Sequence, residues 1–264
     1  MRKHSDYHTH TILCKHAKGE IDAYIQTALD VNLEEIGFAD HAPEPIGFDP
    51  GHRMDVREMP EYVNRVEKMR MDSQGLSIRL GLEVDCYLGF EPFIEKLRND
   101  YPVEYTIGSV HFIQGMSIFH TEPLQLSDED SRAAIQGYFD LVQGAARAKV
   151  IDIIGHLDVL KLVMPDARRT IYEIAKETLN IIAEEGKVLE MNLSGLRKPV
   201  NESYPDAVLL EAAAELKIPV CLGGDAHRPE QVGMHFEKAV KILRQVGYTR
   251  QGKAGPGLNV FIPG

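Results

Sequence analysis

Histidine and carboxylate residues recur in this sequence where short apolar stretches end. The first group lies in Asp6-Tyr7-His8-Thr9-His10 and is followed by His16. His8 and His10 are two positions apart, so both imidazoles face the same side of an extended strand. Two neutral imidazoles on one face can share a divalent metal ion. The spacing therefore predicts a metal site near the start of the chain.

Strand-like and helix-like stretches alternate along the rest of the chain. Strand-length stretches, mostly β-branched or aromatic, cover 6–10, 35–41, 78–85, 105–112, 151–158, 188–193 and 220–225. Helical spacing of apolar residues covers 21–29, 171–182 and 208–216. Pro60 is placed to open a further helix to about residue 70, and Ser127-Asp128-Glu129-Asp130 is typical of the cap and acidic first turn of a helix to about residue 148. Seven such alternations predict a parallel sheet, and their regularity favours closure into a barrel; a doubly wound open sheet is the alternative.

The organisation of the chain predicts one domain over residues 1–264, because no linker, low-complexity run or change of composition interrupts it. The segment 251–264 is rich in Gly and Pro, and we expect it to wrap the surface. An apolar content of 44% and a charged content of 26% are ordinary for a globular protein that buries a full core.

Charge, apolar runs and cysteines restrict the partners. No apolar run approaches the roughly 20 residues that span a bilayer, and no apolar signal segment precedes Asp6, so we expect a cytoplasmic protein without a membrane partner. The odd count and spacing of Cys14, Cys86 and Cys221 predict reduced thiols. A net charge of -11 argues against nucleic acid, but an anionic substrate fits if metal ions or arginines reverse the sign locally.

Functional groups gather at the carboxyl ends of parallel strands. Seven of the eleven histidines fall at or just after the predicted strand ends, as do two carboxylates. The candidate metal ligands are His8, His10, His16, His41, Glu83, His111, His156, Asp225 and His227. Imidazole and carboxylate donors suit Zn, Mn or Fe and argue against a closed structural zinc site. Three ions with three or four ligands each would use the whole set if one carboxylate, for which Glu83 is the natural choice, is shared between ions. Such sites are typical of phosphate-ester hydrolysis.

The ordered motifs resemble those of the polymerase and histidinol phosphatase (PHP) superfamily. They are the HxH at 8–10, Asp40-His41, Glu83, Gly108-Ser109-Val110-His111, Gly155-His156 and Asp225-Ala226-His227. More closely, 6–11, 14–17, 81–85 and 192–198 resemble the PHP-type histidinol-phosphate phosphatases. The resemblance runs from residue 6 to about residue 230, nearly the whole chain.

This resemblance implies a distorted (β/α)7 barrel with a trinuclear metal centre at the carboxyl ends of its strands. It implies one ion on His8, His10, Glu83 and Asp225, a second on Glu83, His111 and His156, and a third on His16, His41 and His227. The implied activity is hydrolysis of the small molecule L-histidinol phosphate, in histidine biosynthesis, by a metal-activated hydroxide.

Charged residues near these motifs are candidates for contact with the substrate. Arg197 is the first candidate to bind phosphate, because a guanidinium can do so bidentately; Lys161 and Arg53 are further candidates. Asp40 or a metal-bound water is expected to protonate the leaving alkoxide. Asp85 either orients a ligand histidine or contacts the substrate amine.

Two other predictions concern the surroundings of the ligands. Asp6 and Asp158 are expected to orient ligand histidines from behind. The stretch 114–126, which includes His120, matches no family pattern and is expected to line the substrate pocket.

Three alternatives stay open. The chain could act on another phosphate ester, as a nucleotide phosphatase or a polymerase-associated exonuclease, although its acidic balance argues against the exonuclease. It could be a non-catalytic metal-binding regulatory protein, although the full ligand set argues against that. An amidohydrolase-like barrel also begins with HxH, but the seven strands and the position of Glu83 argue against it. The sequence leaves the oligomeric state open.

Overall fold

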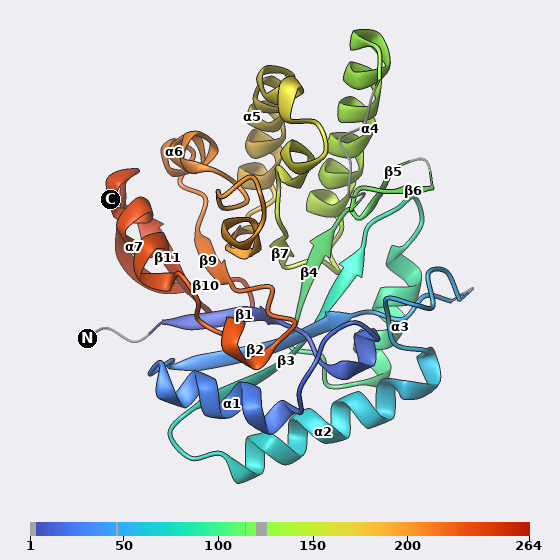
Figure 1. The fold of residues 1–264 in the computed structure, drawn as a ribbon, viewed down its shortest axis with the longest axis vertical. Coiled ribbons are helices and arrows are strands. Elements are labelled where there is room, and N and C mark those ends of the chain that lie inside the picture. The colour runs from blue at the N-terminus through green and yellow to red at the C-terminus, as the bar shows by residue number, and fades with distance from the viewer. Residues whose placement is uncertain (1–3, 46, 114, 120–125) are drawn as a thin grey trace.

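A curled sheet occupies the centre of the molecule (Figure 1). The computed structural model describes residues 4–45, 47–113, 115–119 and 126–264. In this part of the chain, seven parallel strands follow one another in the sheet. They are β1 (Ser5–Thr9), β2 (Glu35–His41), β3 (Ser77–Asp85), β4 (Tyr105–Ser109), β7 (Ile153–Ile154), β8 (Val188–Asn192) and β9 (Val220–Gly223). The predicted parallel strands and distorted barrel are thus confirmed.

The two ends of this parallel run meet at the segment after β9. Ala226 bridges to Thr9 in parallel, its N–H donates to the His8 carbonyl (3.1 Å), and its carbonyl accepts from the His10 N–H (2.9 Å). The last strand therefore returns beside the first, and residues of positions 8–10 and 225–227 come together at one rim.

Helices connect the strands and lie outside the curled sheet (Figure 1). They are α1 (Ile21–Asp30), α2 (Met59–Asp72), α3 (Glu91–Asp100), α4 (Asp128–Arg147), α5 (Arg168–Glu184), α6 (Ala207–Glu215) and α7 (Phe236–Gln245). The predicted cap of α4 is present, because the Ser127 hydroxyl accepts from the Asp130 N–H (3.2 Å). Helix α3 was not predicted; only Ile94 and Leu97 of its ten residues are buried, so few apolar positions mark it in the sequence.

The C-terminal segment corrects one prediction. Instead of wrapping the surface, it forms an antiparallel hairpin of β10 (Tyr248–Ala254) and β11 (Leu258–Pro263), and Phe261 of β11 pairs with Val220 of β9. Leu258 and Val260 alternate with less buried residues and pack into the core, which is the pattern of a strand. The Gly-Pro-Gly sequence is confined to the turn of the hairpin.

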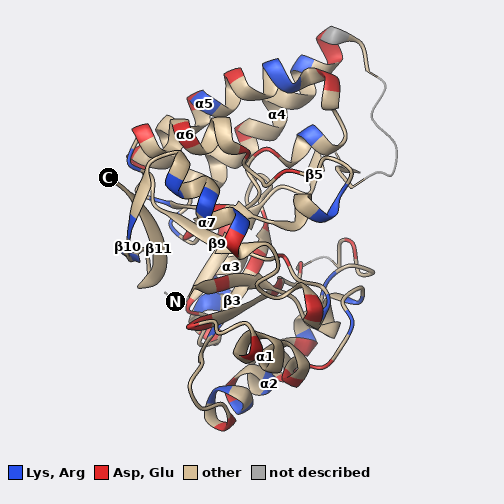
Figure 2. Ribbon diagram, turned by 60° about the vertical axis from the view of Figure 1, so that its left-hand side comes forward, with Lys and Arg blue, Asp and Glu red and all other residues tan. Residues whose placement is uncertain are grey.

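Charged residues of both signs are spread over the outer helices, as α2 and α4 illustrate (Figure 2). Among the described residues, no helix is long and apolar enough to cross a membrane.

A short hairpin of β5 (Phe112–Ile113) and β6 (Met116–Ser117) follows β4. Residues 114 and 120–125 lie outside the described part, so the prediction for the stretch 114–126, His120 included, stays a prediction.

Tyrosine packing fills the barrel below the strand ends. Tyr7, Tyr105, Ile107 and Ile153 belong to one buried apolar cluster. The Tyr105 hydroxyl donates to the Tyr7 carbonyl (2.6 Å), and the Tyr105 ring lies against the bare Cα of Gly81. This packing around Tyr105 supports strand β3, which carries Glu83.

We expect Gly81→Ala to destabilise the fold, because a Cβ at this position would overlap the Tyr105 ring. Overpacking of a dense core costs about 1–3 kcal/mol, so the urea midpoint should fall. Gly137→Ala in α4 is the matched control: its Cβ meets no atom within 4 Å, and removal of a helical glycine stabilises by up to about 1 kcal/mol. A wild-type midpoint for the Gly81 variant would contradict the packing argument.

Candidate metal centre

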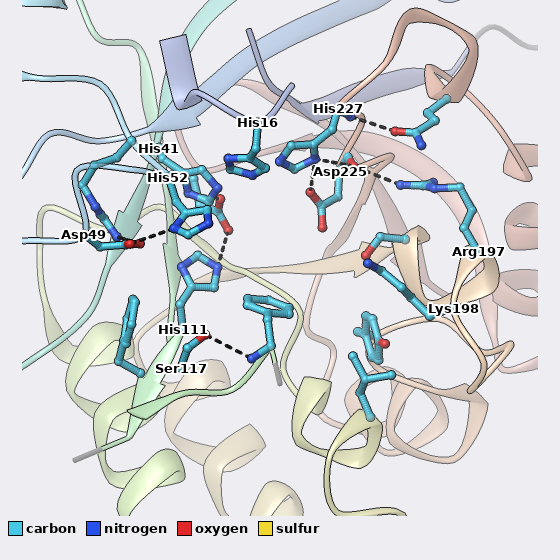
Figure 3. A pocket seen from close by; sticks show the side chains of 18 residues that line it. His16, His41, Asp49, His52, His111, Ser117, Arg197, Lys198, Asp225 and His227 are labelled. Atoms are coloured by element: carbon cyan, nitrogen blue, oxygen red, sulfur yellow. Dashed lines mark hydrogen bonds and ion pairs between the residues drawn. The ribbon is translucent and has the colours of Figure 1, made fainter. Parts of the chain in front are cut away.

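A cavity of about 560 Å³ opens at the carboxyl ends of the parallel strands (Figure 3). Six of the nine predicted ligands line it, namely His16, His41, Glu83, His111, Asp225 and His227. The remaining three, His8, His10 and His156, are buried next to them. All nine predicted ligands therefore converge on one place, although they come from positions 8 to 227.

Glu83 lies at the centre of the cluster, and its side chain is 2% exposed. One of its oxygens, Oε2, is 3.3 Å from His8 Nε2 and 2.9 Å from His41 Nδ1. The other, Oε1, is 3.2 Å from both His111 Nε2 and His156 Nε2. The carboxylate thus faces two sets of imidazoles, the arrangement expected of a ligand shared between ions.

The candidate ligand atoms form compact groups in which all atoms lie within 4.8 Å of one another. Three such groups are His8/His10/Asp225, Glu83/His111/His156 and His16/His41/His227. They correspond to the partition that the family resemblance implies, with Glu83 Oε2 3.6 Å from His10 Nε2 at the edge of the first group. A further group, His10/His41/Glu83, contains one residue from each of these three groups.

The nitrogen atoms of this cluster suit divalent metal ions. Nε2 of His8, of His10 and of His227 is buried without a hydrogen-bond partner in the described part of the chain. A buried polar atom without a partner is costly, and a metal ion would satisfy each of these nitrogens. The donor set of imidazoles and carboxylates, without a thiolate, matches the ions that such sites take.

Burial and neighbouring charges set the protonation of the ligands. Burial lowers the pKa of His41 to about 4 and that of His227 well below its usual value, so both rings offer a free lone pair at neutral pH. Burial opposes ionisation of Glu83 and Asp225, but the surrounding imidazoles, His8 first, outweigh it and hold both pKa values well below the usual range. Both carboxylates are therefore available as anionic ligands.

Two carboxylates orient imidazoles from behind. Glu190 Oε1 is 2.6 Å from His8 Nδ1, and Asp85 Oδ1 is 2.8 Å from His111 Nδ1. Each carboxylate accepts the Nδ1 proton, so Nε2 is left free to bind a metal ion. The sequence analysis missed Glu190, although a charged residue in the middle of the buried strand β8 was a usable signal.

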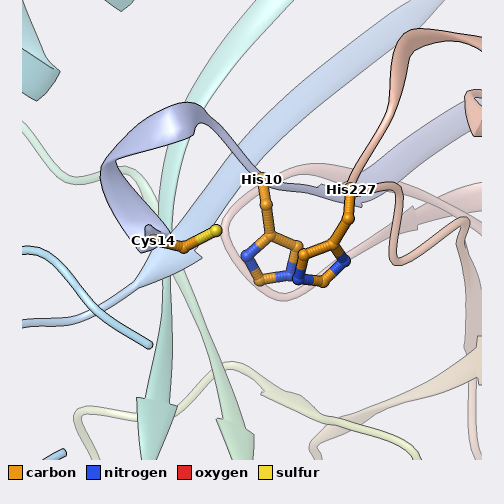
Figure 4. Close-up of side chains that lie close together, drawn as sticks. All are labelled: His10, Cys14 and His227. Carbon is orange, nitrogen blue, oxygen red and sulfur yellow. The ribbon is translucent and has the colours of Figure 1, made fainter. Parts of the chain in front are cut away.

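Cys14 was not predicted as a ligand, yet its sulfur lies within 4.8 Å of ligand atoms of His10 and His227 (Figure 4). Its Sγ accepts a hydrogen bond from the Ala17 N–H (3.2 Å). Burial raises the pKa of the Cys14 thiol to about 12, so the group is protonated at neutral pH. A protonated thiol is a weak ligand, and we leave Cys14 out of the ligand set.

The structure departs from the expectation that Asp40 protonates a leaving group. Asp40 is fully buried and accepts hydrogen bonds from the Thr11 N–H (3.0 Å) and the His41 N–H (2.9 Å). Its Oδ1 also lies 3.5 Å from His10 Nδ1. Enclosed in this way, Asp40 supports ligands and does not reach the cavity.

Lys161 and Asp158 also lie elsewhere than expected. The Lys161 amino group is completely buried and donates to Asp158 Oδ2 (2.8 Å) and to the Ser203 carbonyl (2.6 Å). It therefore ties two loops together and is not placed to bind phosphate. Asp158 is bound to this lysine and not to a ligand histidine.

The structure also places the two other carboxylates that were expected near the ligands, Asp6 and Asp85. Asp6 accepts from the N–H groups of Gly224 (2.8 Å) and Gly233 (3.2 Å), so it holds the segment after β9 and not an imidazole. Asp85 has one oxygen near His111 and the other 2.6 Å from Arg53 Nη2. Both Asp85 oxygens are therefore occupied, which favours the orienting role over contact with a substrate amine.

Two cations lie on one wall of the cavity. Arg197 Nη2 donates to the carbonyls of Gly224 (2.8 Å) and Asp225 (2.9 Å), while its Nη1 is buried and has no partner in the described residues. Lys198 points into the cavity (Figure 3). The sequence analysis singled out Arg197 but missed Lys198, although the two are adjacent in one motif.

The opposite rim carries a histidine that the sequence analysis did not assign to the site. His52 Nδ1 is 2.7 Å from Asp49 Oδ1, and its ring stands edge-on to that of His16 at 5.4 Å (Figure 3). Phe119 lies over His111 with 5.4 Å between ring centroids. Nothing in the spacing marked His52, because it lies in a loop and not at a strand end.

Comparison with known proteins agrees with this geometry. A family model of the PHP domain matches residues 6–194. The "Probable histidinol-phosphatase" of Deinococcus radiodurans is 40% identical over 92% of this chain and 93% of its own length. The "Histidinol-phosphatase" of Bacillus subtilis is 30% identical over 88% and 96%. The chain belongs to the PHP domain family, as its motifs predicted.

A solved structure supports the fold. The histidinol phosphate phosphatase of Lactococcus lactis, complexed with zinc, L-histidinol and phosphate, matches with a TM-score of 0.80 and 23% identity. The match covers 97% of this chain and 98% of that chain. The curled parallel sheet with its outer helices is therefore an architecture already known from a solved structure.

We expect Glu190→Gln to weaken metal binding, because the amide no longer holds the Nδ1 proton of His8 as a carboxylate does. Loss of such a partner typically costs about 10- to 100-fold in metal affinity. Competition with a chromophoric chelator, together with elemental analysis, measures the change. Glu184→Gln, on the exposed face of α5, should leave the affinity unchanged. An unaltered affinity in the Glu190 variant would refute its orienting role.

Proposed function

We propose that this chain is a metal-dependent phosphatase that hydrolyses L-histidinol phosphate to L-histidinol and phosphate. The observation that carries the proposal is Glu83, whose two oxygens face separate sets of imidazoles beside a cavity with cations on one wall. Two relatives in the same family bear the name histidinol-phosphatase, and the Lactococcus lactis structure contains the two products of this reaction. We further propose that residues 1–264 act as one catalytic domain.

The proposed centre holds three divalent ions, Zn, Mn or Fe, one at each of the groups described above. Bound ions would supply positive charge against the phosphate oxygens and lower the pKa of a water molecule so that it attacks phosphorus at neutral pH. Glu83 would be shared between ions, because its two oxygens face different imidazoles. Asp225 supplies the second carboxylate of the centre.

The phosphate group of the substrate lies, in this proposal, between the centre and the cationic wall. Arg197 offers its unpartnered Nη1, and Lys198 offers an ammonium group on a flexible stem. Their charges favour the dianionic phosphate over a neutral ester. Because Asp40 is enclosed, the proton for the leaving alkoxide comes from water in the cavity.

Part of the cavity wall is apolar and can contact the carbon skeleton of the substrate. Phe112, Phe119, Leu162 and Tyr204 line the same cavity as the two cations. A cavity of about 560 Å³ falls within the range that small-molecule sites occupy, roughly 300–1,000 Å³. The imidazole and methylene groups of histidinol are of a size and polarity that this wall accepts.

A panel of phosphate esters tests the function. We expect kcat/KM for L-histidinol phosphate to exceed that for p-nitrophenyl phosphate and for nucleotides by at least about tenfold, or ~1.4 kcal/mol of transition-state stabilisation. Exhaustive chelation should abolish the activity, and added Zn or Mn should restore it. Preference for a nucleotide would replace histidinol phosphate as the substrate, whereas activity that survives chelation would remove the metal mechanism.

The cationic wall predicts the effect of Lys198→Met. Hydrogen bonds to charged groups contribute about 1.5–3 kcal/mol, so KM for the phosphate ester should rise by about tenfold or more. Inhibition by inorganic phosphate should weaken in parallel. Lys149 is an exposed lysine at the amino end of β7, away from the carboxyl ends of the strands. Lys149→Met is therefore the control, and its KM should be unchanged. If KM and phosphate inhibition stay the same in the Lys198 variant, its role in binding is refuted.

A further inference from the structure

Arg53 carries a buried charge beside the cavity, and the mechanism above does not use it. Its side chain is 4% exposed. Its Nη2 is 2.6 Å from Asp85 Oδ2 and 3.4 Å from Asp49 Oδ2, and its Nη1 is 3.7 Å from Glu44 Oε1. Its Nη1 also donates to the Ala42 carbonyl (3.4 Å). One guanidinium thus holds together a loop and the end of strand β3.

The carboxylate that Arg53 binds is the one that orients a metal ligand. Asp85 Oδ1 is 2.8 Å from His111 Nδ1, and His111 Nε2 is 3.2 Å from Glu83 Oε1. A continuous chain of short contacts therefore runs from Arg53 through Asp85 and His111 to the shared carboxylate. All of its members are buried.

We propose that Arg53 is a positioning residue for the metal centre. It acts through Asp85 on His111 and joins residues 42–45 and 47–58 to that centre. The proposal deepens the metal-dependent function and rests on His111 as a ligand. Asp49, whose other oxygen holds His52 at the rim, is bound to the same guanidinium. The position of the loop that carries Asp49 and His52 is thereby coupled to the geometry of the metal centre.

Electrostatics gives Arg53 this role in preference to binding phosphate. Within the described residues, Glu44, Asp49 and Asp85 all lie within 4 Å of its terminal nitrogens. Removal of one partner from a buried ion pair leaves an uncompensated charge, which the structure must relieve by moving. Without Arg53, Asp85 would turn toward water, and His111 would lose the contact that fixes its ring.

The test compares metal binding in Arg53→Met, Arg53→Lys, Asp85→Asn and the double variant Arg53→Met/Asp85→Asn. We expect Arg53→Met and Asp85→Asn each to weaken metal binding by about 10- to 100-fold in a chelator competition. The double variant should lose no more than Asp85→Asn alone, because both changes act through one contact. Arg53→Lys keeps a cation and should recover part of the affinity.

A spectroscopic measurement and a control complete the design. The visible spectrum of the cobalt-loaded protein should change in Arg53→Met. It should not change in Arg57→Met, whose exposed guanidinium pairs with Asp55 in the same segment. In steady-state kinetics Arg53→Met should lower kcat more than it raises KM. If Arg53→Met fails to fold, Arg53→Lys and Asp85→Asn decide the outcome by the same measurements.

Three results would overturn the proposal. They are additive losses in the double variant, wild-type metal affinity in Arg53→Met, and a rise in KM alone, which would make Arg53 a phosphate ligand. The metal measurements need no substrate. A chain that binds metal as expected but does not hydrolyse histidinol phosphate would therefore refute the proposed substrate and leave the role of Arg53 standing.

Discussion

The buried carboxylate of Glu83 is the constraint on which the site depends. An ionised carboxylate that is 2% exposed loses its hydration and must be compensated by cations or by strong hydrogen bonds. Imidazoles from β1, from β2 and from the segments after β4 and β7 surround it, and their own free nitrogens also need a partner. Metal ions meet both requirements at once, so metal binding and the stability of this rim are linked.

The residues behind the ligands explain how the imidazoles keep their direction. Glu190, Asp85 and Asp40 each lie next to the inner nitrogen of one histidine, which leaves the outer nitrogen toward the centre. Below them the barrel is closed by the apolar packing around Tyr105. A rigid, dry layer under the site reduces the freedom of the side chains above it, so the ligands are preorganised before an ion arrives.

The convergence of the candidate ligands could be predicted from the sequence because parallel strands share one edge, so a residue at a strand end has a known place. The residues behind them could not, because tertiary contacts alone define them: Glu190 contacts His8 across 182 positions. Lys161 and Lys198 illustrate the same limit. Both follow a strand and a family motif, but one amino group turns back to Ser203 and the other points into the cavity. Spacing gives the position of a residue along the chain, not the direction of a long side chain beyond the strand.

With divalent ions bound, the charge of the site would be opposite in sign to the net charge of the molecule, and this would determine how a phosphate ester binds. The chain carries a net charge of -11, which repels anions at long range. Divalent ions at the three groups would exceed the charges of Glu83 and Asp225, and Arg197 and Lys198 extend the positive region along one wall. An ester that enters would therefore place its phosphate deep in the cavity, against the bound ions. The imidazole ring and methylene groups of the ester would then meet the aromatic wall near the rim, where Phe119 lies over His111.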